Sequence, residues 1–470
     1  MRKILLGTTA VVGLALVAQA ANAQQARPAA RPAPAPAAAP AAPPPLPATS
    51  VAPTGTAAAI YQTPVGITGA GPHGSDGLPN RPETPTTSGI IVRLGGFFDF
   101  SYGNVQDDAD KAFVRNTAGS ITTAKGRQRS DFRTESEINL YADGLAANGM
   151  RYGAVFELQM DAMTSTAGTG TGVDYDELYG FVKGSWGELR FGQEDSAASL
   201  LQIRRPGTLW MGDSDAWDEF TVNSGYVIAG VGDGNDATKI IYLSPQFMGF
   251  DAGVSYAPNR GEGEQTNTAV STTAFQRDRT GLENEISAAL RYRGTFGPVG
   301  VGASFVAQFA DAAAQSANGT PIADKAQNIT TYAAGLLLRA YGFAVGGDYT
   351  WGNYRTTPAN GAIAQGIDGS SQWATGITYT IGALTIGGMY SQGTQDNGGT
   401  VADRTQTYMG LGAAYVLAPG MTLFANYNQI SDENIPTAAP TKTGATLVSF
   451  GAGDNTRDIT VLVAGVRIAF

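Results

Sequence analysis

The sequence predicts an all-β fold, a transmembrane antiparallel up-and-down β-barrel of about 16 strands. Three observations support this prediction: apolar and polar residues alternate along many short segments, tight and long connections alternate between them, and an export signal precedes them. Alternation with period two indicates a strand with one apolar and one polar face. A sheet of this many strands must close on itself, because open edges would stay unpaired.

The alternation is clearest in the segment RYGAVFELQM at 151–160. Its apolar face consists of Tyr152, Ala154, Phe156, Leu158 and Met160, and its other face of Arg151, Gly153, Val155, Glu157 and Gln159. The segments VRLGGFFDF at 92–100 and LENEISAALRYR at 282–293 show the same division, and weaker copies follow as far as Phe470. We count about 16 such segments from Gly89 onward, most of them near the length that a tilted membrane strand needs.

The connections between these segments fall into two classes. Tight connections occur at 247–250, 295–300 and 340–343, whereas 258–281 and 431–458 are long and polar. Short turns at one end and long loops at the other are typical of an up-and-down meander.

Two closed architectures fit this pattern. A soluble β-sandwich or propeller hides its apolar faces, whereas an outer-membrane barrel turns them outward and keeps a polar lumen. The export signal, the segment lengths and charged residues in mid-strand favour the membrane barrel. Aromatic residues near the segment ends, such as Trp186, Phe250, Tyr341 and Phe343, would suit the membrane interface.

The chain before the barrel divides into two parts. Residues 1–23 have a basic start, a short apolar run and the sequence Ala21-Asn22-Ala23, which predicts a cleaved signal peptide; a membrane anchor is the alternative, but the run is short. Residues 24–88 are rich in proline and alanine, which predicts a disordered periplasmic spacer. The barrel is then expected over 89–470.

Composition excludes several functions. The formal net charge is −10 and the isoelectric point is near 4.7, which argues against a nucleic-acid partner. The chain has no cysteine, and its single histidine, His73, lies in the spacer, so a histidine-based catalytic triad or zinc site within the barrel is excluded. We therefore expect no catalytic residue, no enzymatic activity, no resident metal and no cofactor.

Three stretches resemble a known family. VRLGGFFDFSYG at 92–103, GFVKGSWGELRFGQEDSA at 180–197 and the terminal VRIAF at 466–470 are similar to the Gram-negative general diffusion porins, especially those of alphaproteobacteria. The resemblance implies a 16-stranded barrel in the outer membrane, a homotrimer, and both termini on the periplasmic side. It also implies that the third external loop folds back into the barrel as a constriction.

This loop should follow the fifth strand, 187–193, and run from Glu194 to about Gly225. It holds the acidic residues that we expect at the constriction, Glu194, Asp195, Asp213, Asp215, Asp218 and Glu219. Alternation places basic residues on the pore wall, namely Arg93, Arg133, Arg151, Arg190, Arg291 and Arg293. Opposed carboxylates and guanidinium groups would set up a field across the pore that discriminates solutes by charge.

Plainer interpretations stay open beside this one. Each wall arginine can instead pair with a neighbouring carboxylate such as Glu135, Glu137, Glu157 or Glu188. The stretch DSDAWDE at 213–219 departs from the EF-hand pattern, so a calcium ion bound in the acidic loop would be incidental.

The resemblance implies a channel for passive diffusion of small hydrophilic solutes and ions. Two alternatives remain. The channel could select one substrate along the aromatic residues Trp210, Trp217 and Phe220, although such residues more often pack a loop, and the proline-rich segment could add a tether to peptidoglycan. Net charge favours cation preference.

The chain ends on an alternating segment. Phe470, Ile468, Val466, Ala464 and Leu462 share one face, with Arg467 on the other. We expect this last strand to pair with 92–100 and close the barrel. Its apolar face would lie on outer-membrane lipid, and the resemblance implies that the outer-membrane assembly machinery recognises Phe470.

Overall fold

The computed structural model describes the following residues: 89–111, 114–115, 121–122, 127–159, 174–212, 217–221, 231–232, 234, 236–259, 281–314, 321–322, 326–354, 366–437, 440, 442–450 and 454–470. The expected signal peptide and the whole proline-rich segment, residues 24–88, lie outside these residues, so both stay predictions. The first strand begins at Ile91, just inside the expected start of the barrel.

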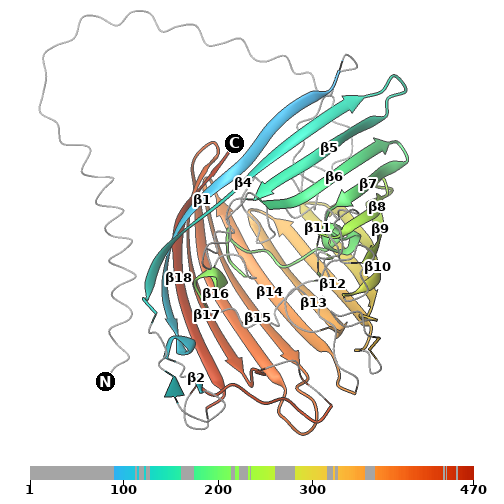
Figure 1. Cartoon of the computed structure of the whole chain (residues 1–470). Helices are drawn as coiled ribbons and strands as arrows, with labels where there is room; N and C mark the ends of the chain where they lie inside the picture. Colours follow the sequence, from blue (N-terminus) through green and yellow to red (C-terminus); the bar gives the residue numbers. More distant parts are fainter. Residues whose placement is uncertain are drawn as a thin grey trace, which may run out of the picture. The chain divides into compact units, whose positions relative to one another are not determined.

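Sixteen strands form one closed antiparallel barrel in which chain neighbours pair throughout (Figure 1). They are β1 (Ile91–Asp107), β4 (Ser130–Leu145), β5 (Arg151–Gln159), β6 (Asp174–Gly184), β7 (Gly187–Gln193), β8 (Thr238–Leu243), β9 (Phe250–Asn259), β10 (Glu283–Phe296), β11 (Val299–Asp311), β12 (Ile329–Ala340), β13 (Phe343–Asn353), β14 (Ser370–Ile381), β15 (Leu384–Gln395), β16 (Arg404–Ala418), β17 (Met421–Glu433) and β18 (Thr456–Ala469). The predicted fold class and strand number are confirmed.

The remaining described elements are short. A separate hairpin consists of β2 (Val114–Arg115) and β3 (Ile121–Thr122), and the helical turns are η2 (Asp108–Lys111), α3 (Ala197–Leu201) and η3 (Asp218–Phe220). In the described part of the chain, no helix is long and apolar enough to span a membrane.

The barrel closes between its first and last strands, as predicted. β1 and β18 pair in an antiparallel register that sets Asp99 opposite Arg467. At the end of the seam, Gly96 and Phe470 exchange two backbone hydrogen bonds of 3.1 Å each. The terminal residue therefore completes the ladder, while its side chain stays 63% exposed.

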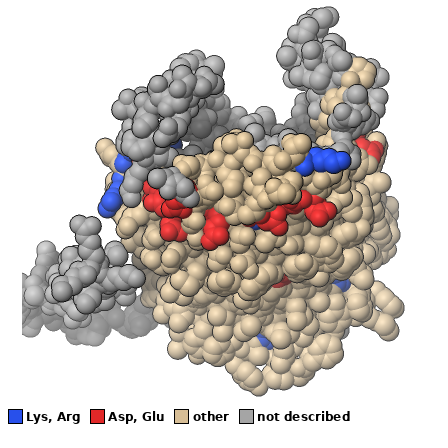
Figure 2. All heavy atoms as spheres, turned by 90° about the horizontal axis from the view of Figure 1, so that it is seen from below, with Lys and Arg blue, Asp and Glu red and all other residues tan. Residues whose placement is uncertain are grey.

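The alternation of the sequence turns apolar side chains outward and polar ones inward. On β1, Phe98 and Phe100 are each 39% exposed, whereas Asp99 and Ser101, which alternate with them, are buried. Figure 2 shows the same division from outside: a large part of the visible surface carries no charged side chain, and acidic side chains gather in one row. An apolar exterior around a polar interior is the arrangement of an outer-membrane barrel.

Tight turns and long loops lie at opposite ends of the barrel. Two-residue turns join β10 to β11, β12 to β13, β14 to β15 and β16 to β17. The turn at Tyr341 and Gly342 has positive φ at both residues, 53° and 83°, as a type I′ hairpin requires. Aromatic side chains such as Trp186, Phe250 and Phe343 are about half exposed beside these turns, where a membrane interface would favour them.

The fifth barrel strand in chain order is β7, as predicted, and it ends at Gln193. The next strand, β8, begins only at Thr238. The connection between these two strands is therefore longer than the expected loop, which ended near Gly225. We call residues 194–237 the inner loop.

Candidate functional site

The backbone of the inner loop binds to serine side chains on the inner wall. The amides of Ala197 and Ala198 donate to the hydroxyls of Ser255 and Ser287, each over 3.1 Å. Further along, the Ile203 amide donates to Ser304 Oγ over 2.7 Å. Because these serines lie on the buried, inward faces of β9, β10 and β11, the loop folds into the barrel as predicted.

Helix α3 lies near the start of the inner loop and packs against the barrel wall. Ser196 caps its N-terminus by accepting from the Ser199 amide. The helix contributes to an apolar cluster that consists of Ala197, Ala198, Leu200, Leu201, Val231, Ile241, Leu243, Ala289, Val306 and Ala333. Burial of these side chains stabilises the docked loop, and Figure 1 shows the helix against the neighbouring strands.

A buried ion pair holds the middle of the loop. Both Nη1 and the backbone amide of Arg205 donate to the carboxylate of Asp348 on β13, over 3.0 to 3.2 Å. Gln372 on β14 donates to the same carboxylate over 3.2 Å. Sequence reasoning missed this anchor, although Asp348 stands on the inward face of an alternating segment.

The second half of the loop crosses to the closing seam. Thr208 Oγ1 donates to Asn426 Oδ1 on β17 over 2.9 Å, and Asn426 Nδ2 donates back to the carbonyls of Leu209 and Trp210. Trp210 Nε1 donates to Asp99 on β1 over 2.7 Å. The inner loop thus contacts the wall from β9 round to β1.

An apolar cluster inside the barrel packs the aromatic residues of the loop. It consists of Val105, Leu209, Met211, Trp217, Met389, Tyr408, Ala414, Phe424, Ile430, Ile459, Val461 and Val463, with Trp210 and Phe220 packed against it. Trp217 is 2% exposed and stacks on Tyr408. These rings therefore pack the loop, as the plainer interpretation of the sequence had it.

The predicted acidic residues of the constriction have different surroundings. Glu194 is buried and accepts from Arg190 Nη1 over 2.8 Å. Asp195 is half-buried and accepts from the Ser199 hydroxyl over 3.1 Å, while Asp218 is buried in η3. Asp213, Asp215 and the side chain of Glu219 lie outside the described residues.

The predicted basic residues face the lumen, and most contact carboxylates. Arg93 pairs with Asp143. Arg133 pairs with Glu135 over 2.8 Å. Arg151 differs from these two arginines: among the described residues, no hydrogen-bond partner reaches its Nε or Nη2.

The other three wall arginines contact three carboxylates. Arg190 Nε donates to Glu188 over 2.9 Å, in addition to its contact with the loop. Arg291 and Arg293 both donate to Asp251 Oδ2 over 2.7 Å. Much of the basic wall is thus neutralised within the wall itself, and the proposed field across the constriction stays a prediction.

Three further pairs join the strands near the seam. The guanidinium groups of Arg404, Arg457 and Arg467 each bind a carboxylate through two donors. Their partners are Asp432, Asp107 and Asp99, and all six side chains are buried. Sequence alternation indicated Arg467, but the pairing requires the register of neighbouring strands.

Carboxylates also gather in two groups among the described residues. Glu137, Glu157 and Asp176 bring three oxygens within 4.8 Å of one another, and so do Glu177, Asp195 and Asp236. Hard cations such as calcium take oxygen ligands of this kind. The expected incidental calcium ion stays a prediction.

Comparison with known proteins gives a family model and related folds. The model of the Gram-negative porins matches residues 7–435. An anion-selective porin from Comamonas acidovorans superposes with a TM-score of 0.50 at 16% identity, covering 81% of this chain and 100% of that chain. OmpT of Vibrio cholerae (0.48, 14%, 82% and 100%) and a Rh. blastica porin variant (0.46, 16%, 81% and 100%) are also similar, whereas no curated protein matches.

Proposed function

The chain belongs to the Gram-negative porin family, and we propose that its barrel conducts small hydrophilic solutes and ions by passive diffusion. As a porin it is a channel of the outer membrane. The observation that carries the proposal is a polar inner wall, on which buried Ser255, Asp348 and Asn426 hold a loop that narrows the lumen. Such a lumen admits water and selects by size and charge.

Reconstitution into a planar lipid bilayer tests passive diffusion. The single-channel current should rise in proportion to salt concentration and should not saturate with any one neutral sugar. Saturation by a single solute would favour the substrate-selective alternative, and absence of conducting steps would overturn the channel itself. Packing of Trp210, Trp217 and Phe220 against the wall supports the unselective interpretation.

We further propose a preference for cations. The formal net charge is −10, and two groups of three carboxylates lie close together among the described residues. In a gradient of potassium chloride, the reversal potential should shift toward the potassium potential. A shift toward the chloride potential contradicts this preference.

Family membership supports assembly as a homotrimer. Purified protein that is not heated should migrate near three chain masses, about 146 kDa with the signal peptide included. After heating it should migrate near the 48.6 kDa of one chain. The exposed apolar band provides the surface for contact with lipid and with neighbouring copies. An unheated species of single-chain mass at every detergent concentration argues for a monomer.

We propose that the channel has no enzymatic activity and requires no cofactor. The single histidine, His73, stands outside the barrel sequence, so the residues available for nucleophilic catalysis are few. Calcium would at most be incidental, in which case chelation should leave the conductance unchanged. A conductance that depends on added calcium would contradict this.

We propose that the proline-rich segment adds a tether to peptidoglycan, since its composition predicts an extended spacer. Removal of residues 24–60 would then release the barrel from sedimenting peptidoglycan. Equal co-sedimentation of both forms excludes the tether and leaves the channel proposal intact.

A further inference from the structure

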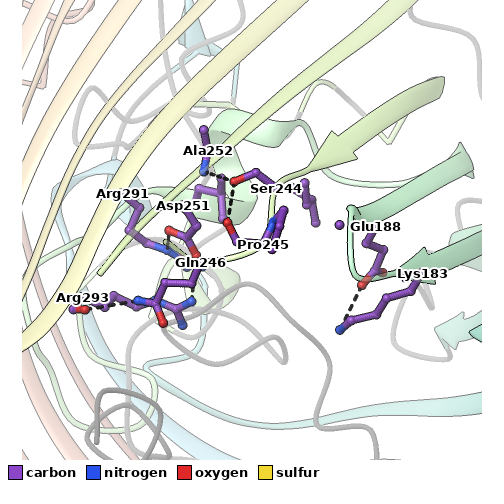
Figure 3. A pocket seen from close by; sticks show the side chains of 13 residues that line it. Lys183, Glu188, Ser244, Pro245, Gln246, Asp251, Ala252, Arg291 and Arg293 are labelled. Atoms are coloured by element: carbon purple, nitrogen blue, oxygen red, sulfur yellow. Dashed lines mark hydrogen bonds and ion pairs between the residues drawn. The ribbon is translucent and has the colours of Figure 1, made fainter. Parts of the chain in front are cut away.

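A cavity of about 250 Å3 opens into the lumen near the tight turns of β6 to β10. This volume corresponds to on the order of eight water molecules. Figure 3 shows the side chains around it: Lys183 and Glu188 approach from one side, and Asp251, Arg291 and Arg293 from the other. The turn with Ser244, Pro245 and Gln246 lies between the two groups. We call this cavity the turn-end pocket.

Cationic groups outnumber carboxylates in the lining of the turn-end pocket. Its lining includes Lys183, Arg291 and Arg293 against Glu188 and Asp251. Asp251 Oδ2 accepts from both guanidinium groups over 2.7 Å, so one negative charge is shared by two positive charges. The lining therefore keeps an excess positive charge.

On the opposite side of the pocket, the ion pair of Lys183 is long and partly exposed. Lys183 Nζ lies 3.5 Å from Glu188 Oε2, and the lysine side chain is 46% exposed. Glu188 also accepts from Arg190 Nε over 2.9 Å, so this carboxylate keeps a hydrogen bond when the lysine moves away. The ammonium group can therefore turn into the pocket without leaving a buried carboxylate unpaired.

A second cation stands beside Lys183 across the ladder. Arg151 on β5 is the direct register partner of Lys183 on β6, and both side chains face the lumen. Like charges opposite one another on neighbouring strands repel. Within the described residues, Nε and Nη2 of Arg151 lie buried with no hydrogen-bond partner. Two guanidinium nitrogens without a partner beside an ammonium group form an arrangement that an anion would stabilise.

We propose that the turn-end pocket binds a small oxyanion, the phosphate or carboxylate group of a solute in transit. Arginine suits this role because its planar donors match the two oxygens of an oxyanion, and the lysine adds a mobile point charge. The inference rests on the proposed channel function and adds an anion subsite to a pore that otherwise favours cations. This subsite lies at the end of the lumen opposite the long loops.

Inorganic phosphate tests the subsite in single-channel recordings at fixed potassium concentration. Phosphate added to the turn side should reduce the chloride current with a measurable half-blocking concentration. In Lys183→Gln and Arg293→Gln this concentration should rise about tenfold, as the loss of one charge-assisted hydrogen bond predicts. Both variants keep the main pairs of the site, Arg190 with Glu188 and Arg291 with Asp251.

Lys442→Gln is the matched control, because Lys442 is exposed in the long connection between β17 and β18. This variant removes one positive charge at the other end of the barrel. Its half-blocking concentration of phosphate should equal that of the unaltered protein. The side of addition can be fixed with Lys442→Cys and an impermeant maleimide, since the chain has no cysteine of its own. Equal half-blocking concentrations in all variants, or no block by phosphate in a conducting channel, overturns the subsite. Absence of conductance instead refutes the channel.

Discussion

Arg467 on the last strand lies against the ring of Trp210 in the inner loop, with its guanidinium carbon 4.5 Å from the ring centroid. Both residues also hydrogen-bond Asp99 on the first strand, Arg467 through two donors and Trp210 through its indole nitrogen. One carboxylate thus joins the closing seam of the barrel to the loop that narrows its lumen. The complete contact of all three residues therefore requires that β1 and β18 be paired.

Trp210→Ala should release the second half of the inner loop. Trp210 has a φ of 58°, a strained value for a residue other than glycine, and alanine keeps this strain while it loses the contacts. The lost cation–π contact contributes about 1 kcal/mol and the lost charge-assisted hydrogen bond about 2 kcal/mol. Single-channel recordings should show a larger mean current with more fluctuation.

Trp186→Ala serves as the control for this prediction. Trp186 is 45% exposed beside the turn between β6 and β7, on the outer side of the barrel. Its removal should leave both the current and its fluctuation unchanged. Identical recordings from the two variants would show that Trp210 does not hold the loop.

Asp432→Asn should destabilise the barrel strongly. The Asp432 carboxylate accepts from Arg404 Nε over 2.8 Å, from Arg404 Nη2 over 2.6 Å and from Gln406 over 2.9 Å. Arg404 is 1% exposed, so its charge would stay buried without a counterion. The free energy of unfolding in urea should fall by about 3–5 kcal/mol.

The neighbouring position provides a matched control. Glu433 follows directly on β17 and is exposed, because alternation turns it to the other face. Glu433→Gln removes one carboxylate charge and should change the free energy of unfolding by less than about 0.5 kcal/mol. If both variants lose the same stability, net charge and not the buried pair is responsible.

Gly335→Ala should push the inner loop away from β12. A Cβ atom at Gly335 would lie directly on the carbonyl oxygen of Ile203, which belongs to the loop backbone. Overpacking of this kind costs about 1–3 kcal/mol, and here the loop is the part that can move. Conductance and cleavage of the loop by added protease should both increase.

Gly388→Ala tests whether this effect is specific. Gly388 lies on β15, and its added Cβ would meet the end of the Leu411 side chain at 3.3 Å and the carbonyl oxygen of Gly410 at 3.7 Å, an ordinary contact. Conductance should stay unchanged in this variant. A rise in both variants would point to general loosening of the barrel.

The barrel was predictable from the sequence because its signals are local. Period-two alternation in a segment such as 151–160 is independent of the partner strand, and the same holds for tight turns such as that at Tyr341. Pairs between residues two apart, such as Arg133 with Glu135, also follow from alternation, since both side chains face the lumen.

The contacts of the inner loop were not predictable in this way. Arg205 meets Asp348 across 143 residues, and Trp210 meets Asp99 across 111. Such contacts depend on barrel closure and on the course of the loop, for which the sequence contains no period. For the same reason the sequence indicated lumen arginines without indicating which of them share a carboxylate.

Phe470→Ala should separate assembly of the barrel from its stability. The backbone of Phe470 forms both hydrogen bonds with Gly96, and its ring is 63% exposed, so alanine keeps the seam. Protein refolded into detergent should therefore unfold within about 1 kcal/mol of the unaltered barrel. If the ring is the signal for the assembly machinery, the amount of folded barrel in the outer membrane of living cells should fall severalfold. Ile468→Ala, which shortens an exposed side chain on the same face, should keep the normal amount. Normal assembly of Phe470→Ala in cells would remove the ring from the signal and leave the terminal strand with its structural role alone.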